Sequence, residues 1–327
     1  MAASLGLGSY LGECTTADDD RYVAATESAL ASGINLVDTA INYRCQRSER
    51  AIGEALGRAI ASGAVARDEV IVCTKGGYIP LDGEAPESRE AYDEYVRREF
   101  VARGVVRLDD IVAGGHSLAP SYLADQIARS RANLGLETID LYYVHNPEQQ
   151  LDEVSPEVLH VRLREAFALL ESQCASGAIA RYGCATWNGL RTEPTARGHL
   201  GLAEMVAIAT EVAGPGHHFR AVQLPINLAM NEAVRLPTQP MVSGAVVSLL
   251  QCASELGVSV VASATLMQSK LAQNLPAQLR DALPGFATDA QRAIAFVRSL
   301  PVVMTALVGM KSAAHVAENL GAARPEE

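Results

Sequence analysis

Short apolar runs that alternate with longer helical patterns constrain this chain more than any other feature. The runs are rich in Val, Ile and Leu without strict alternation, which is typical of parallel strands that are covered on both faces. Eight of them begin near Leu5, Ile34, Val70, Ile139, Arg181, Ala221, Ser259 and Met304. Most are separated by one strand-helix unit. The pattern therefore predicts an α/β protein, a (β/α)8 TIM barrel with residues 1–327 as one domain.

The segments between these runs have helical periodicity. Ile52 and Leu56 share one face of a helix for which Ser48 is the expected N-cap. Apolar residues over 246–253 mark a later helix, beginning with Val246 and Val247. Glycines stand where four of the helices should end, at Gly33, Gly135, Gly177 and Gly257.

The interval between the third and fourth runs is longer than the others. Its excess, roughly residues 76–110, contains a turn-rich stretch followed by a charged helical pattern. We expect a loop insertion here at the active-site face, because barrel enzymes build their sites at the carboxyl ends of the strands. A surface excursion without a role in the site is the alternative.

Composition excludes several classes of partner. The formal net charge is −11, which opposes binding to nucleic acid and to anionic membranes. No apolar run is long enough for a membrane span, and the first ten residues do not resemble a signal peptide. Six cysteines form no CxxC motif, which favours reduced thiols over a metal site or a disulfide framework. We expect a cytoplasmic protein without a metal, a nucleic-acid partner or a membrane partner; the oligomeric state is open.

Four polar residues stand where strands should end. Asp38 and Tyr43 follow the second run, Lys75 ends the third, and His145 ends the fourth. Taken singly, each has an ordinary structural explanation. Because the carboxyl ends of barrel strands converge on one rim, we expect the four side chains to meet there. A phenol, an amine and an imidazole are groups that transfer protons, so the arrangement predicts an active site.

Longer motifs surround these residues. They read INLVDTAINY, SERAIGEAL, TKGG, DLYYVHNPE, AVQLPIN and ALVGMKSAAHVAENL in chain order. Together they resemble the aldo-keto reductase superfamily over nearly the whole chain, from Leu5 to Asn319. The resemblance implies a barrel that uses NADPH to reduce the aldehyde or ketone of a small molecule. It also implies a catalytic tetrad at Asp38, Tyr43, Lys75 and His145.

The chemistry of carbonyl reduction agrees with these roles. A carbonyl that accepts a hydride becomes an alkoxide and needs a proton, which Tyr43 would donate. The phenol of tyrosine has an ordinary pKa near 10, and we expect the Lys75 ammonium to lower it. Asp38 would hold Lys75 in place, and His145 would hydrogen-bond to the carbonyl oxygen and orient the substrate.

The resemblance also implies contacts to the cofactor and the substrate. Gln223 would hold the nicotinamide carboxamide, and Thr186 would supply a hydroxyl where relatives often have Ser-Asn. The residues expected at the adenosine 2′-phosphate follow the last strand and are Lys311, Ser312, His315 and Asn319. Loops after the strands predict a substrate pocket that includes Trp187, Arg44 and Tyr78. Cys45 is a candidate reactive thiol if Arg44 and Arg47 lower its pKa, and an inert thiol is the alternative.

Two other functions fit the same fold. One is a cofactor-binding regulatory or accessory subunit with little turnover. The other is a cofactor-cycling isomerase or lyase that acts on a sugar-like substrate. The sequence leaves the natural carbonyl, the direction of the reaction and the preference for NADPH over NADH open.

Overall fold

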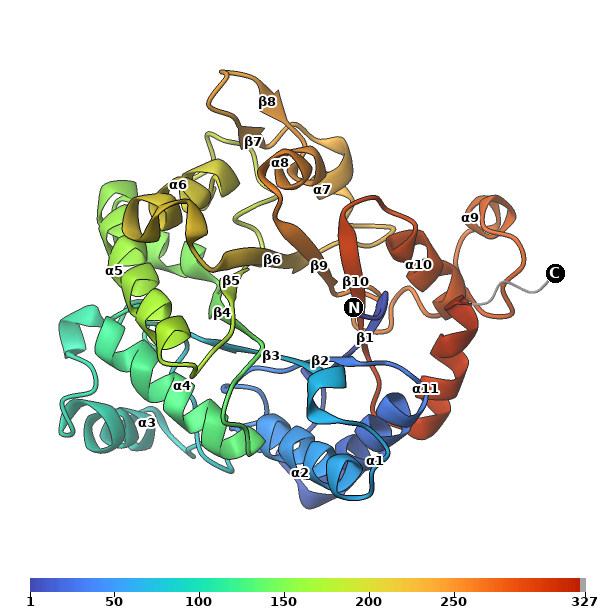
Figure 1. Ribbon diagram of the computed structural model, residues 1–327, viewed down its shortest axis with the longest axis horizontal. Coiled ribbons are helices and arrows are strands. Elements are labelled where there is room, and N and C mark those ends of the chain that lie inside the picture. The colour runs from blue at the N-terminus through green and yellow to red at the C-terminus, as the bar shows by residue number, and fades with distance from the viewer. Residues whose placement is uncertain (324–327) are drawn as a thin grey trace.

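The computed structural model describes residues 1–323 and forms a closed barrel of parallel strands (Figure 1). The end of the predicted domain, residues 324–327, lies outside the described residues. Neighbouring strands follow the order β1-β10-β9-β6-β5-β4-β3-β2 around the barrel. Their bounds are β1 Leu5–Gly8, β2 Leu36–Asp38, β3 Ile71–Gly76, β4 Leu141–His145, β5 Tyr182–Ala185, β6 Phe219–Pro225, β9 Ser259–Ser263 and β10 Val303–Gly309. All eight correspond to the predicted apolar runs, so the predicted barrel is confirmed.

Helices surround the barrel on its outside (Figure 1). They are α1 Thr16–Ala31, α2 Arg47–Ala61, α3 Arg89–Val96, α4 Pro120–Leu134, α5 Pro156–Ala175, α6 Leu202–Ala213, α7 Glu232–Arg235, α8 Leu249–Leu256, α9 Ala277–Ala282, α10 Asp289–Arg298 and α11 Ala313–Leu320. Gly135 and Gly257 are the C-caps of α4 and α8, as predicted. Gly33 and Gly177 follow the ends of α1 and α5 by two residues, also as predicted.

Two local predictions are wrong. Ser48 is not an N-cap, because α2 begins at Arg47 and the Ser48 hydroxyl instead donates to the carbonyl of Ser9 on the neighbouring loop. Val246 and Val247 do not begin a helix but form the short strand β8 (Val246–Val247), which pairs with β7 (Gln239–Pro240). The Ser248 side chain then caps α8 by accepting from the N–H of Gln251.

Two apolar layers hold the barrel together. The inner layer fills the barrel with side chains that include Leu36, Tyr143, Val261 and Leu307. The outer layer packs the other face of each strand against the helices. Full burial of each such Val, Leu or Phe side chain contributes roughly 1.5–3 kcal/mol. Since the strands are buried on both faces, their ends form a rigid base for the polar residues that follow them.

The residues predicted as an insertion, 76–110, extend from the end of β3 into the long connection that leads to α4. It includes α3, a π-helical turn over 97–101 and a 3₁₀ turn over 108–110. Its apolar side chains pack into a small cluster of their own, which also includes Tyr122 of α4. In Figure 1, α3 lies outside α4, at the edge of the molecule. Most of the insertion therefore rests on the flank of the barrel.

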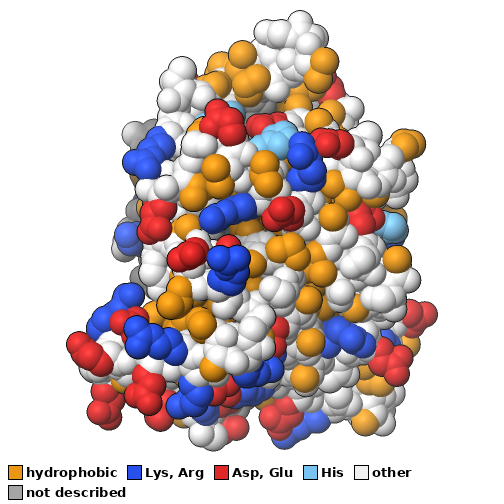
Figure 2. All heavy atoms as spheres, turned by 90° about the vertical axis from the view of Figure 1, so that its left-hand side faces the viewer, with side chains coloured by type: hydrophobic (Ala, Val, Ile, Leu, Met, Phe, Trp, Pro, Cys, Tyr) orange, Lys and Arg blue, Asp and Glu red, His pale blue; other side chains and the backbone are white. Residues whose placement is uncertain are grey.

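Charged side chains of both signs are interspersed on the face that includes the outer helices around α5 (Figure 2). This face carries no large block of basic residues. Among residues 1–323, no helix combines the length and the apolar character that crossing a bilayer requires.

Candidate active site

The ends of three adjacent strands place the predicted tetrad at one rim. Asp38 is the last residue of β2, Lys75 lies one residue before the end of β3, and His145 is the last residue of β4. Tyr43 follows β2 by five residues, in the segment before α2. Asp38, Lys75 and His145 are buried, whereas Tyr43 is partly exposed. The prediction that strand ends gather these side chains agrees with this placement.

Lys75 and Asp38 form a buried ion pair. The ammonium of Lys75 donates to Asp38 Oδ1 and, at 2.8 Å, to the carbonyl of Thr39. The second oxygen of Asp38 accepts from Nε2 of Gln223 at 2.7 Å. Burial acts to lower the pKa of Lys75, but the electrostatic and hydrogen-bonding effects of Asp38 and Tyr43 together outweigh it and raise that pKa. Lys75 is therefore a fixed positive charge at the bottom of the site.

Tyr43 lies directly over this charge. The centre of its ring is 4.9 Å from Lys75 Nζ and 5.9 Å from the centre of the His145 ring. Desolvation raises the pKa of Tyr43, and the positive charge of Lys75 only partly offsets this shift. We expected Lys75 to bring the pKa of Tyr43 below its ordinary value, and for this state of the site that prediction is wrong. Tyr43 is consequently a protonated phenol at neutral pH, the form that donates a proton.

His145 is neutral and is held from behind by a second histidine. Burial, with a smaller effect of Lys75, lowers the pKa of His145 well below its ordinary value. Nε2 of His116 lies 2.7 Å from the carbonyl of His145, and Nδ1 of His116 lies 2.7 Å from Nε2 of Gln150. Because an amide nitrogen can only donate, Nδ1 accepts and the proton of His116 sits on Nε2. Arg162 donates to Oε1 of the same Gln150 and so fixes the orientation of that amide.

Nothing in the sequence pattern connected His116 or Gln150 to this site. Gly77 allows His116 to approach the carbonyl of His145. It adopts φ +147°, and a Cβ at this position would lie 2.9 Å from His116 Nε2 and 3.0 Å from the carbonyl of His145. The conformation and the space both favour glycine. The β3–α4 connection thus supports His145 through its backbone.

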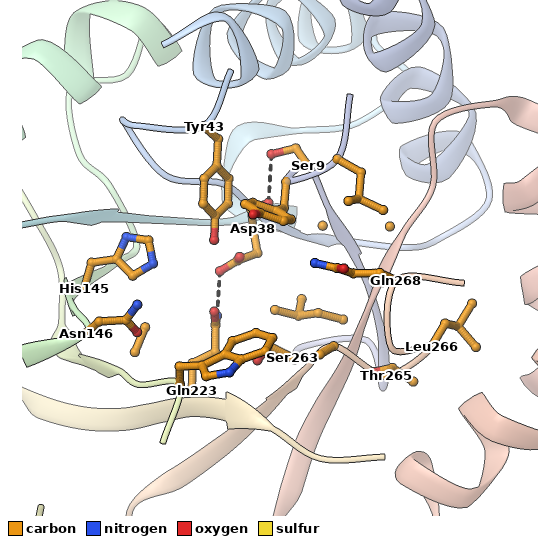
Figure 3. Close-up of a pocket in the computed structure, with 18 of the residues that line it drawn as sticks. Ser9, Asp38, Tyr43, His145, Asn146, Gln223, Ser263, Thr265, Leu266 and Gln268 are labelled. Atoms are coloured by element: carbon orange, nitrogen blue, oxygen red, sulfur yellow. Dashed lines mark hydrogen bonds between the residues drawn. The ribbon is translucent and has the colours of Figure 1, made fainter. Parts of the chain in front are cut away.

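A cavity of about 450 Å³ opens over the tetrad. Figure 3 shows Tyr43, His145 and Asn146 on one side of it, with Asp38 and Gln223 at its base. Of the other predicted residues, Thr186, Trp187 and Tyr78 also line it. No Lys or Arg lines the cavity within the described part of the chain. Several of its buried polar atoms have no hydrogen-bond partner among residues 1–323, namely Asn42 Oδ1, His145 Nδ1, Thr186 Oγ1 and Thr265 Oγ1.

Arg44 does not belong to this cavity, so its prediction as a substrate-pocket residue is wrong. Its guanidinium points away and donates to the carbonyls of Glu13 and Thr15 and to the carboxylate of Asp19. Only 1% of the Arg44 side chain is exposed. The backbone of residues 44–46 has positive φ throughout, which turns this side chain toward the loop after β1.

A second cavity of about 770 Å³ adjoins the first and shares Leu266, Ser269 and Gly309 with it. His315 and Asn319, both predicted at the adenosine 2′-phosphate, line this second cavity. Lys311 and Ser312 do not line it. Lys311 is 3.1 Å from Asp18 in an ion pair, and the Ser312 hydroxyl caps α11 by accepting from the N–H of His315.

Two arginines that we did not predict line the second cavity. Arg292 pairs with Asp289, whereas Arg280 of α9 is exposed. Arg280 lies in the short helix α9, which interrupts the irregular stretch between β9 and α10, and Arg292 lies in the first turn of α10. A single basic residue on a surface helix carries no signal in the sequence that distinguishes a ligand contact from a solvated side chain.

Comparison with known proteins assigns the chain to a family. The family model described as "Aldo/keto reductase family" matches residues 4–202, which include the whole tetrad. The chain belongs to the aldo/keto reductase family. A D-threo-aldose 1-dehydrogenase from Pseudomonas sp is 30% identical over 172 residues. That match covers 50% of this chain and 44% of the relative, so it spans less than half of the dehydrogenase.

Solved structures of aldo-keto reductases have the same fold. One from Klebsiella pneumoniae, in complex with NADPH, superimposes with a TM-score of 0.63 at 20% identity and covers 98% of this chain and 85% of its own. Another from Bacillus halodurans, in a holo form, gives 0.63 at 19% identity and covers 99% and 87%. These aldo-keto reductases confirm the (β/α)8 barrel of the present family member.

Proposed function

We propose that this protein is an NADPH-dependent reductase of an aldehyde or ketone in which Tyr43 donates the proton. One observation carries the proposal: Tyr43 and His145 face the same cavity, over the buried Lys75–Asp38 pair. A regulatory subunit without turnover has no need of a buried ammonium beneath a phenol. Such a pair costs desolvation energy, and well-packed apolar residues in its place would often stabilise a fold equally well.

Each member of the tetrad has a role that follows from its surroundings. His145 is neutral, so its ring can hydrogen-bond to a carbonyl oxygen without adding a charge. Tyr43 is protonated and lies beside His145, where it can transfer its proton to the same oxygen as negative charge develops. The phenolate left behind faces the Lys75 ammonium, which stabilises it electrostatically. Asp38 keeps Lys75 charged and in position.

The described residues fit a dinucleotide. NADPH would supply the hydride when bound. Gln223 and Thr186 line the first cavity, and the Thr186 hydroxyl has no partner within residues 1–323. The second cavity continues from the first, and His315, Asn319 and Arg280 line it with polar groups suited to a phosphate. The Klebsiella pneumoniae structure cited above, which was solved in complex with NADPH, supports the same cofactor.

We further propose a neutral, polyhydroxylated carbonyl as the substrate. The lining of the first cavity includes Tyr10, Asn42, Tyr78 and Asn146, which carry hydroxyl and amide groups, and within residues 1–323 it includes no Lys or Arg. Such groups suit sugar hydroxyls and offer nothing to a carboxylate or a phosphate. The similarity to a D-threo-aldose 1-dehydrogenase points the same way, and implies that oxidation of an aldose with NADP+ should be measured beside reduction.

A cofactor titration followed by a substrate panel tests the proposal. NADPH and NADH are titrated against the purified protein by fluorescence. Turnover is then followed by NADPH absorbance with neutral aldoses, simple aldehydes and carboxylated carbonyls of the same size, and with NADP+ in the oxidation direction. We expect tight NADPH binding and the highest kcat/KM with neutral hydroxylated compounds. NADPH binding without turnover on any compound would instead favour the accessory role.

A further inference from the structure

Two cysteine thiols lie next to each other beside the active site. Cys14 belongs to the loop between β1 and α1, and Cys45 belongs to the segment between β2 and α2 that also contains Tyr43. Their sulfur atoms are 3.4 Å apart. Since the sulfurs of a disulfide are about 2.05 Å apart, closing the bond requires a movement of roughly 1.4 Å. The proposed carbonyl reduction uses neither thiol.

Arg44 links the two loops that carry these thiols. Arg44 Nε donates to the carbonyl of Glu13 at 2.9 Å, and Arg44 Nη2 donates to the carbonyl of Thr15 at 3.2 Å. These contacts bracket Cys14 on one loop and adjoin Cys45 on the other. The two thiols therefore lie next to each other on loops that Arg44 already links.

The two thiols differ in accessibility. Cys14 is half-buried, whereas Cys45 is only 7% exposed. Burial and the neighbouring Cys14 thiol raise the pKa of Cys45 to about 12, which the nearby Arg47 guanidinium only partly offsets. Cys14 is thus the thiol that a small oxidant in solution reaches first, and Cys45 is the buried resolving thiol next to it.

We propose that Cys14 and Cys45 form a redox-sensitive thiol pair that hydrogen peroxide converts to an intramolecular disulfide. The Cys14 thiolate attacks one oxygen of peroxide, the O–O bond breaks, and water leaves after protonation; Cys14 becomes a sulfenic acid. Cys45 then loses its proton and attacks the sulfur of Cys14, the S–O bond breaks and a second water leaves. Two thiols are oxidised, and one peroxide is reduced to two waters. A dithiol such as dithiothreitol reverses the reaction by exchange.

The disulfide would join the two loops that frame one side of the active-site cavity. Tyr10 and Leu11, from the loop that carries Cys14, line the cavity. The ring of Tyr10 packs edge-on against Tyr43, with ring centres 5.0 Å apart. Oxidation would consequently fix the Tyr10 loop to the Tyr43 segment by a covalent bond.

Peptide mapping of the full-length protein tests this assignment. Reduced protein is treated with hydrogen peroxide, blocked with a maleimide, digested without reductant and analysed by mass spectrometry. We expect the protein to lose two of its six thiols and to yield one cross-linked peptide joining Cys14 and Cys45, which dithiothreitol removes. Cys45→Ser should accumulate a sulfenic acid on Cys14 that dimedone traps.

Cys14→Ser should lose the cross-link, and the matched control Cys174→Ser, which alters another half-buried thiol, should retain it. Irreversible oxidation of Cys14 without the cross-link, or equal cross-linking of other cysteine pairs, would overturn the proposal. Because the readout is chemical, it does not depend on whether the protein reduces a carbonyl.

Discussion

Removing Lys75 from beneath Tyr43 should destabilise the barrel, because its partner would be left buried and charged. Lys75 and Asp38 expose only 1% and 5% of their side chains. Breaking such a buried pair costs about 3–5 kcal/mol, since one uncompensated charge remains. In the variant Lys75→Met, Asp38 retains its hydrogen bond from Gln223, so we expect a loss toward the lower end, about 3 kcal/mol. With an unfolding entropy of about 2.1 cal/mol/K per residue, that loss corresponds to a fall in Tm of roughly 4 °C for a chain of 327 residues.

A double-variant cycle separates the charge effect from the effect of changing the side chain. Asp38→Asn removes the orphaned charge, so Lys75→Met combined with Asp38→Asn should be roughly 1–3 kcal/mol more stable than the two single losses predict. Urea unfolding followed by circular dichroism supplies the free energies. Lys311→Met is the matched control, because the Lys311 side chain is one-third exposed in its pair with Asp18. Its loss should lower the free energy of unfolding by less than about 1 kcal/mol. Equal stability of Lys75→Met and the wild type would refute the view that the buried pair is ionised.

Three further outcomes follow from the site. Arg280→Ala should weaken binding of NADPH about tenfold but leave NADH binding nearly unchanged. Parallel titrations with Lys270→Ala as the control measure this, and equal losses for both nucleotides would count against a contact of Arg280 with the 2′-phosphate. Gly77→Ala should unfold at lower urea than Gly63→Ala and lose about 1–3 kcal/mol, because both glycines have positive φ but only Gly77 has neighbours within 3.0 Å; matching losses would contradict this. The raised pKa of Tyr43 keeps the proton donor protonated through neutral pH. The rate of reduction should therefore decline only in the alkaline range, while the rate of alcohol oxidation rises with pH. A decline of the reduction rate near pH 6 would argue against Tyr43 as the acid.

The positions of the catalytic side chains were predictable from the sequence because they depend on the barrel alone. Parallel strands that close into a ring bring their carboxyl ends to one rim, so Asp38, Lys75 and His145 could be placed together before their contacts were known. The same argument predicted that Tyr43, Trp187 and Tyr78 lie near that rim.

The long cations could not be placed in this way. Arg44 follows Tyr43 directly, yet its guanidinium finds two loop carbonyls and Asp19 on the side away from the cavity. Lys311 pairs with Asp18, a residue 293 positions earlier in the chain. Partners such as these depend on loop conformations that hydrophobic periodicity does not encode. The prediction that Val246 and Val247 begin a helix was wrong for a related reason, because two adjacent apolar residues fit a strand as well as a helix.

The proton transfer from Tyr43 is the central claim, and Tyr43→Phe tests it most directly. The substitution removes only the hydroxyl oxygen, and Tyr10 and His145 continue to pack against the ring. With the best carbonyl from the panel, we expect kcat to fall by about 10²–10⁴-fold, while the Kd for NADPH changes by less than about threefold. A kcat within a few fold of the wild type, at unchanged NADPH affinity, would contradict the mechanism.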